Sequence, residues 1–407
     1  MDRYIVISSD CHAGLPPERY RDYLDPQYRE LFDQALPLQM EMTAKAEETF
    51  LIKEINDEWR ADIEQELTGA WDPAERTRML DNDGIAGEVI YPDGITERNA
   101  GPFGASLGLP TKDIVPELQW AGARAHNRWL SELCQNDPDR HHGVAMMPLL
   151  WDVDLALEHL QWCVDNGLRS VMIPHLVGEL DHYHHPRYNP FWEACESLGV
   201  IVNFHSGATP INDYFGKNFP ESDGVEYTGA MGVFVSEVMW WTYRPLTFMI
   251  WGGVFERYPK LKVAVAEAGT VWVLPSYLRL IDHNYHEVHF ASKLGDFYSH
   301  LSMAPSDYFR RNVGIGASCM PRADVEVRHE VGLDRIMWGS DYPHPEGTWP
   351  NTRQHLIETF AGFPDEEIAA MLGENAIRFY GFDRDRMESI ARRIGPEKSL
   401  FRGSTAA

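Results

Sequence analysis

The chain has 407 residues and a formal net charge of −26, from 62 acidic and 36 basic side chains. A surface this acidic repels nucleic acid and anionic membranes, so we expect neither as a partner. Hydrophobic residues make up 44% of the sequence and charged residues 24%, which is ordinary for a globular protein and excludes wholesale disorder.

Cysteine usage and apolar patterning both indicate a cytoplasmic protein. The five cysteines are scattered and contain no C-x-x-C pair: Cys11, Cys134, Cys163, Cys195 and Cys319. This spacing argues against a disulfide framework or a thiolate zinc site. No signal peptide is expected, and the most apolar stretch, Gly229 to Val254, contains Glu237, Arg244 and Pro245. We predict a buried helical region there and not a membrane span.

Short apolar or β-branched runs recur along the chain, with helical patterns between them. The expected strands are Tyr4 to Ser8, Ala86 to Tyr91, Gly143 to Pro148, Ser170 to Pro174, Val200 to His205, Leu261 to Ala266, Asn312 to Ala317 and Arg335 to Ser340, and the expected helices include Thr111 to Cys134, Val153 to Asn166 and Pro190 to Leu198. Eight such units favour a closed (β/α)8 barrel, a TIM barrel of the α/β class, over an open doubly wound sheet. Neither a Gly-rich dinucleotide loop nor a Walker loop follows the first strand, so no nucleotide site is expected.

Two segments fall outside the barrel pattern. Residues 14–71, between the first two strands, are charged and helix-prone, and such an insertion would overhang the catalytic face as a lid or an oligomer contact. Residues 384–407 form a C-terminal helical extension with a frayed end. We predict one barrel domain over residues 1–383 that contains the insertion.

Side chains that can bind a metal lie at the ends of three expected strands. Asp10 and His12 follow the first strand, and the alternation of side chains points both the same way. His205 ends the fifth strand, and Asp341 closes the eighth, where a buried lone carboxylate needs a compensating partner. Each residue alone has an ordinary structural interpretation. Together these two nitrogen and two oxygen ligands predict a site for zinc, manganese or iron(II).

Three further residues are candidates for the same rim of the barrel. Glu267 ends the sixth strand, and it could bind the metal, bridge to a second metal, act as a general base or form a structural salt bridge. The sequence leaves these roles open. His175 and His344 each lie just past the carboxyl end of a strand, so we expect both in the pocket.

These motifs together resemble the amidohydrolase superfamily, in the branch of metal-dependent barrel enzymes that includes aminocarboxymuconate semialdehyde decarboxylase. The resemblance is carried by residues 9–12, 203–207, 266–269, 339–344 and 373–380. It implies that Asp10, His12, His205 and Asp341 hold one divalent cation, often zinc or manganese, and that the protein is a homodimer. Two positions depart from the family pattern. Asp10 replaces the first histidine of a His-x-His pair, as in acidic variants of the branch, and Glu267 stands where decarboxylase relatives carry a histidine.

The reaction that we predict from the sequence is hydrolysis of an amide, ester, thioester or carbon–carbon bond by a metal-activated water, with Asp341 or Glu267 taking its proton. The alternative is non-oxidative decarboxylation of an aromatic or unsaturated carboxylic acid, with His175, His344 or Asp341 as the acid. A non-catalytic binding barrel is a third interpretation, and the intact ligand set argues against it. The partner is a small-molecule substrate of unidentified structure. One divalent cation is expected, and a second would follow if Glu267 binds metal.

Overall fold

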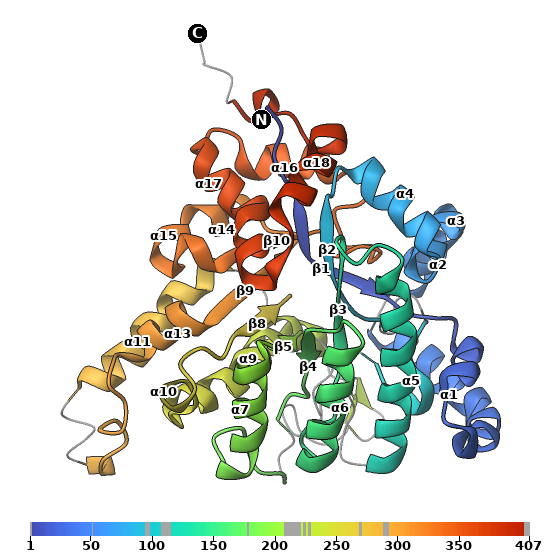
Figure 1. Ribbon diagram of the computed structural model, residues 1–407, viewed down its shortest axis with the longest axis horizontal. Coiled ribbons are helices and arrows are strands. Elements are labelled where there is room, and N and C mark those ends of the chain that lie inside the picture. The colour runs from blue at the N-terminus through green and yellow to red at the C-terminus, as the bar shows by residue number, and fades with distance from the viewer. Residues whose placement is uncertain are drawn as a thin grey trace.

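Eight parallel strands form the centre of the computed structural model (Figure 1). The structure describes residues 2–50, 52–93, 98–106, 115–176, 179–206, 221–222, 225–226, 229–267, 271–287 and 293–402. The strands are β1 (Ile7–Ala13), β2 (Gly87–Pro92), β3 (His141–Met146), β4 (Ser170–Met172), β5 (Ile201–His205), β8 (Val263–Ala266), β9 (Val313–Ser318) and β10 (Ile336–Gly339), and they pair in this order. β1 and β10 approach each other where Asp341 N donates to Asp10 O over 2.9 Å. The predicted (β/α)8 barrel is confirmed.

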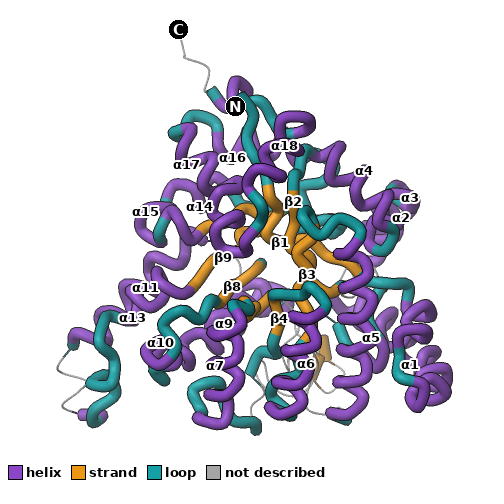
Figure 2. Tube along the Cα trace, in the orientation of Figure 1, coloured by secondary structure: helices purple, strands orange, loops and turns teal. Residues whose placement is uncertain are grey.

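Helices surround the strands on the outside of the barrel (Figure 2). The longer ones are α1 (Arg29–Phe50), α4 (Pro73–Asp83), α5 (Pro116–Gln135), α6 (Val153–Asp165), α7 (Asn189–Leu198), α9 (Ala230–Trp251), α11 (Leu274–His286), α13 (Pro305–Asn312), α16 (Thr352–Phe360) and α18 (Arg384–Ile394). Local sequence explains several of their ends. The side chain of Asp152 caps α6 by accepting from Leu155 N, and α7 stops at Gly199, whose φ of 68° suits glycine. α5 begins at Pro116, a residue favoured in the first helical turn, and its expected start at Thr111 lies outside the described residues.

All eight predicted strands overlap observed ones, and β1 shows the largest shift. It begins at Ile7 instead of Tyr4 and continues to Ala13, so Asp10 and His12 lie inside the strand and not after it. Every residue of β1 is buried, although four of its seven residues are polar. Hydrogen bonds explain this, because Ser8 Oγ accepts from Ser340 N and Ser9 Oγ donates to Met337 O. A pattern of apolar residues cannot reveal such a strand.

Alternate residues of the strands pack into two separate clusters. Ile201 and Ala264 belong to a set that also gathers residues from β1, β2, β3, β4 and β10, and only the barrel interior lies between so many strands. Their neighbours Val202 and Val263 pack with residues of the surrounding helices. This alternation is the period-two pattern of a strand buried on both faces.

The insertion between β1 and β2 is helical, as predicted. It contains α1, α2 (Lys53–Asp62), α3 (Glu64–Leu67) and short 3-10 turns. Glu47 in α1 is buried and pairs with Arg60 of α2 and with Arg98, which lies in the loop after β2. These ion pairs attach the insertion to the rim of the barrel that carries the ends of the strands.

The expected burial of the apolar helical region is only partly observed. α9 was expected to be buried, and Trp241 and Leu246 are, but Val235 and Trp240 in its first half are 67% and 41% exposed. None of the helices in the described part of the chain combines the length and apolarity that a membrane crossing requires.

The C-terminal extension packs on the barrel through the buried ring of Phe401, and the end that was expected to fray lies beyond the described residues.

Candidate active site and metal centre

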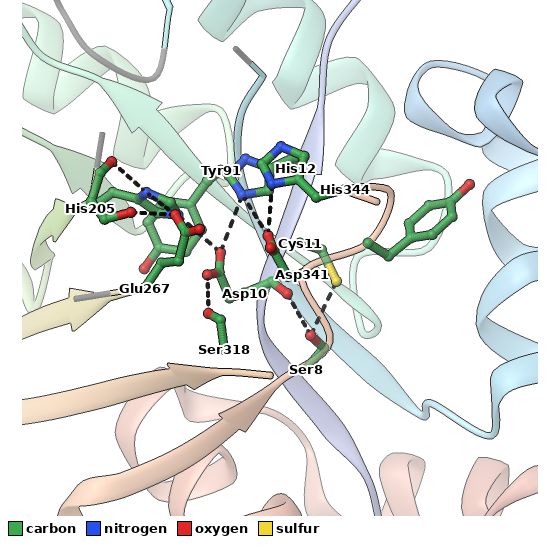
Figure 3. Close-up of polar contacts among 12 residues, drawn as sticks. Ser8, Asp10, Cys11, His12, Tyr91, His205, Glu267, Ser318, Asp341 and His344 are labelled. Atoms are coloured by element: carbon green, nitrogen blue, oxygen red, sulfur yellow. Dashed lines mark hydrogen bonds and ion pairs between the residues drawn. The ribbon is translucent and has the colours of Figure 1, made fainter. Parts of the chain in front are cut away.

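Four predicted metal ligands lie at the carboxyl end of the barrel, in two overlapping groups that share His12 (Figure 3). One group is Asp10, His12 and His205, and the other is His12, Asp341 and His344. Asp10 and His12 come from β1, His205 ends β5, and Asp341 follows β10. Asp10 Oδ1 lies 3.1 Å from His205 Nε2 and 3.6 Å from His12 Nε2, and His12 Nε2 lies 3.2 Å from Asp341 Oδ1. All four residues are at most 2% exposed. The structure therefore brings together the residues that the sequence selected.

Hydrogen bonds to backbone carbonyls set the tautomer of both ligand histidines. His12 Nδ1 lies 2.9 Å from Pro92 O, and His205 Nδ1 lies 2.9 Å from Ser206 O. A carbonyl can only accept, so Nδ1 carries the proton and the neutral ring presents a lone pair at Nε2. Both Nε2 atoms face carboxylate oxygens, which are also acceptors. A cation placed between these converging acceptors would satisfy all of them, so the site fits a divalent metal.

Buried acceptors without donors support the same conclusion. His12 Nε2 and both carboxylate oxygens of Asp341 are buried and have no hydrogen-bond donor. Burial lowers the pKa of His12, but the carboxylates of Asp341 and Asp10 outweigh this effect and raise it. Burial likewise opposes ionisation of Asp341, but His344 and His12 hold the pKa of this carboxyl well below its usual range. Either a proton shared by His12 and Asp341 or a divalent cation can satisfy these acceptors. A cation that binds takes the place of the proton, so its binding should release protons.

Small and polar neighbours hold Asp10 in place. Ser318 Oγ donates a hydrogen bond to Asp10 Oδ2. Gly339 of β10 lies so close that an added Cβ would be 2.8 Å from the Cβ of Asp10. A larger residue at position 339 would therefore displace the carboxylate.

Three neighbouring strands end in the same unusual backbone conformation. Glu267 after β8, Cys319 after β9 and Asp341 after β10 have φ angles of 48°, 49° and 59°. For residues other than glycine this left-handed conformation costs roughly 1–2 kcal/mol and collects at functional sites. Cys319 was missed in the sequence as a site residue. Its position directly after a strand, like that of Glu267, could have indicated it in the sequence. Asp341 likewise follows a strand, by two residues.

Glu267 lies beside the ligand set and is partly buried. Its Oε2 accepts a hydrogen bond from Ser206 Oγ and lies 3.4 Å from His205 Nδ1. Burial, and next the charge of Asp341, raise the pKa of Glu267 to about 7, against the opposing effect of His205. This carboxyl can therefore exchange a proton near neutral pH.

His344 joins the site, as predicted, together with an unpredicted neighbour. Its ring stacks on the ring of His12, with centroids 4.1 Å apart and an angle of 15°, and its Nδ1 lies 3.0 Å from Asp341 Oδ1. Glu267, Asp341, His344 and Glu346 also form a group whose ligand atoms all lie within 4.8 Å of one another. Nothing in the local pattern indicated Glu346, because its place depends on the turn after Asp341.

His175 does not share this arrangement. It is buried, and its ring stacks near Phe204 with centroids 6.5 Å apart. It belongs to none of the groups of possible metal ligands that the described residues form. His175 as a pocket residue therefore stays a prediction, and the structure places it buried after β4.

A buried tyrosine lies against the ligand set. The ring of Tyr91, from β2, is 4.7 Å from the ring of His205, and its hydroxyl donates to Asn203 Oδ1 over 2.9 Å. Burial raises the pKa of Tyr91 well above its ordinary value, so the hydroxyl stays protonated and donates. Tyr91 and Asn203 fix the packing around His205, and the sequence analysis missed both.

A barrel that presents buried histidines and carboxylates at the carboxyl ends of its strands defines a class of metal-dependent enzyme. The sequence profile described as Amidohydrolase matches residues 9–382, and the chain belongs to this family. The resemblance seen in the sequence is confirmed, and the protein is an enzyme of the amidohydrolase superfamily.

Two proteins of known activity and one solved structure are similar to this chain. The chain is 27% identical over 290 residues to a gamma-resorcylate decarboxylase of Rhodococcus jostii (strain RHA1), which covers 67% of this chain and 80% of the relative. It is 23% identical over 326 residues to a 2-amino-3-carboxymuconate-6-semialdehyde decarboxylase of Dictyostelium discoideum, with coverages of 78% and 79%. A 5-carboxyvanillate decarboxylase of Novosphingobium aromaticivorans, solved with bound manganese, has a TM-score of 0.64 at 16% identity and covers 93% of this chain and 97% of its own. At that identity the structural likeness concerns the fold.

Proposed function

We propose that the protein is a metal-dependent, non-oxidative decarboxylase of an aromatic or unsaturated carboxylic acid. The observation that carries the proposal is that both curated relatives described above are decarboxylases, one of them of a hydroxylated aromatic acid. The structural neighbour with bound manganese acts on another aromatic acid. These comparisons favour the alternative reaction of the sequence analysis over the hydrolysis that we predicted first.

The ligand set supports this proposal because it can hold a divalent cation next to the substrate. Asp10, His12, His205 and Asp341 would bind the cation, and two nitrogen and two oxygen ligands suit manganese, zinc or iron(II). When bound, the cation supplies positive charge that orients anionic substrate oxygens and stabilises negative charge that develops during the reaction. Burial of the four residues excludes water from the same place, which strengthens these electrostatic contacts.

Decarboxylation also requires a proton. The bond between the substrate carbon and its carboxylate breaks, carbon dioxide leaves, and the carbon takes up a proton in its place. We assign proton delivery to the pair formed by Asp341 and His344, because His344 Nδ1 lies 3.0 Å from Asp341 Oδ1 and a proton can pass between them. The stacking of His344 on His12 fixes the imidazole in this position.

Hydrolysis is the second candidate, and Glu267 is the observation that favours it. A carboxyl with a pKa of about 7 beside a metal centre is suited to take a proton from an attacking water. The resemblance of the sequence implies a histidine at this position in the decarboxylases of the family. The two reactions therefore differ in what Glu267 does.

A direct assay separates the two reactions. The manganese-loaded protein is incubated with gamma-resorcylate, 5-carboxyvanillate and other hydroxybenzoates, and with a matched series of amides, esters and thioesters. We expect release of carbon dioxide from at least one aromatic acid, formation of the acid from its decarboxylated product in bicarbonate, and loss of both activities in His205→Ala. Release of acid from an ester, amide or thioester without any carbon dioxide from the first series would reject decarboxylation in favour of hydrolysis.

A further inference from the structure

We propose that Tyr342 is a positioning residue that couples the metal centre to the helical insertion, so that cation binding and ordering of the insertion reinforce each other. Tyr342 directly follows the metal ligand Asp341 and is 2% exposed. Its hydroxyl contacts residues 66–69 of the insertion. The inference uses the metal centre of the proposed function, but it does not depend on which reaction the enzyme catalyses.

The backbone of Tyr342 is held between two metal ligands. Its carbonyl oxygen accepts a hydrogen bond from His12 N over 2.7 Å. The preceding residue, Asp341, donates from its N to Asp10 O over 2.9 Å. These two bonds join β1 to the segment that follows β10. A shift of the backbone at Tyr342 therefore displaces metal ligands on both sides of this junction.

The side chain of Tyr342 binds the insertion. Its hydroxyl donates to the carbonyl oxygen of Glu66, in α3, over 2.7 Å. Gly69 leaves the space that the hydroxyl needs, because a Cβ added at this position would overlap the hydroxyl oxygen. The same residue thus contacts a metal ligand through its backbone and the insertion through its side chain.

Arg76 connects the same two parts of the molecule. Its Nη1 donates to Gly69 O over 3.1 Å and to His12 O over 2.9 Å. Its guanidinium lies 5.7 Å from the centre of the Tyr342 ring. The buried guanidinium therefore fixes the ring of Tyr342 and the segment around Gly69 relative to each other, and movement of one is passed to the other.

The acceptors of the metal centre explain why a cation affects this contact. His12 Nε2 and both carboxylate oxygens of Asp341 are buried acceptors without donors, and Asp341 has a left-handed φ of 59°. Both features cost free energy. A cation offsets this cost and holds Asp341 in the conformation that places Tyr342 against Glu66. Linkage then requires that the contact strengthens cation binding by the same factor.

The test measures Mn²⁺ affinity and backbone exchange in the full-length protein. Protein stripped with a chelator is titrated with Mn²⁺ by equilibrium dialysis, and hydrogen–deuterium exchange of residues 64–71 is followed with and without the ion. We expect Mn²⁺ to slow exchange in this segment of the wild type. Tyr342→Phe should weaken Mn²⁺ binding by about three- to tenfold, the range of one hydrogen bond, and reduce the protection by a similar factor.

Gly69→Ala breaks the same contact from the insertion. The added methyl group displaces the hydroxyl of Tyr342, so this variant should lose Mn²⁺ affinity as Tyr342→Phe does. In the Tyr342→Phe background the nearest ring atom lies 3.4 Å from the added carbon, which is an ordinary contact. Gly69→Ala should therefore add little to the effect of Tyr342→Phe. Such non-additivity in a double-mutant cycle identifies two residues that act through one contact.

Tyr188→Phe is the matched control. Tyr188 is buried, and its hydroxyl also donates to a backbone carbonyl, that of Asp181, over 2.6 Å. This variant should lower the melting temperature and leave Mn²⁺ affinity and the exchange of residues 64–71 unchanged. An equal loss of affinity in Tyr188→Phe would show that the effect is general destabilisation and would overturn the coupling.

The remaining outcomes separate this inference from the proposed function. Wild-type affinity and exchange in Tyr342→Phe, or additive effects of Tyr342→Phe and Gly69→Ala, would overturn the coupling and leave the metal centre in place. A wild-type protein that binds no Mn²⁺ would reject the metal centre and the coupling together. Release of carbon dioxide bears on the proposed reaction alone, because none of these measurements uses a substrate.

Discussion

The guanidinium of Arg76 and the carboxylate of Glu88 form a two-point ion pair in the interior of the protein, with Nε–Oε1 and Nη2–Oε2 distances of 2.6 Å and 2.8 Å. Both side chains are completely buried. Arg76 also donates to the carbonyl oxygen of His12 over 2.9 Å, and its guanidinium lies 5.7 Å from the ring of Tyr342, the residue after Asp341. One arginine thus connects the backbone of one metal ligand with the neighbour of another.

Replacement of Arg76 should destabilise the whole barrel. Arg76→Met removes the two-point partner of Glu88 and leaves only His141, whose Nδ1 lies 2.8 Å from Glu88 Oε1. Removing one partner of a buried ion pair typically costs about 3–5 kcal/mol. Arg76→Lys keeps the charge but not the two-point geometry, so its loss should be intermediate. Urea denaturation measures both. Arg279→Met, which breaks an exposed pair with Glu330, should change stability by less than about 1 kcal/mol. Equal midpoints for Arg76→Met and Arg279→Met would contradict the assignment.

The same pair marks the limit of prediction from sequence. Asp341 and Glu267 were found because each closes an apolar run, and a polar residue in that place stands out. Arg76 and Glu88 look like ordinary charges of a helix and a strand, and only closure of the barrel buries them together. Glu346 was missed for a related reason, since its position depends on the turn that follows β10.

His205→Ala should remove the first metal and the activity together. The imidazole is buried, it is a ligand in our assignment, and the other ligands leave an open position when it is lost. We expect metal affinity to fall by at least about tenfold, in the range seen when metal-site residues are removed. Metal analysis after dialysis measures this. His175→Ala is the matched control, because that histidine is also buried but lies outside the ligand groups. Full metal occupancy in His205→Ala would refute the assignment.

Asp324 should make the stability depend on pH. It is 2% exposed and accepts a hydrogen bond from Trp272 N, in the segment that follows Glu267. Burial raises its pKa to about 6 from an ordinary 3.8. An acid whose pKa is raised on folding contributes stability that is fully present below pH 3.8 and is lost as pH rises through 6. The protonated form is therefore the one that the folded protein favours.

Asp324→Asn keeps the acceptor for Trp272 but cannot ionise. The free energy of unfolding of the variant, relative to the wild type, should rise between pH 4 and pH 7 by on the order of 2–3 kcal/mol and then level off. Urea titrations of both proteins across this range measure the difference, and comparison of the pair cancels the other titrating groups. A difference that stays constant with pH would show that Asp324 ionises with its ordinary pKa.

Glu267→Gln tests the residue whose role distinguishes hydrolysis from decarboxylation. The amide is a poorer ligand than the carboxylate, but its oxygen can still accept the hydrogen bond from Ser206. We expect the variant to retain its Mn²⁺ and to turn over more slowly.

Three measurements on one preparation distinguish the roles of Glu267. A general base would leave metal content intact while turnover falls by about 10²–10⁴-fold. A structural role would lower the melting temperature while the rate of the folded, metal-loaded enzyme stays near the wild-type value. Ser206→Ala removes only the hydrogen bond to Glu267, so it separates loss of the carboxylate from loss of its orientation. Unchanged metal content, rate and stability in Glu267→Gln would exclude Glu267 from the site, because a ligand, a base and a structural partner must each alter at least one of these quantities.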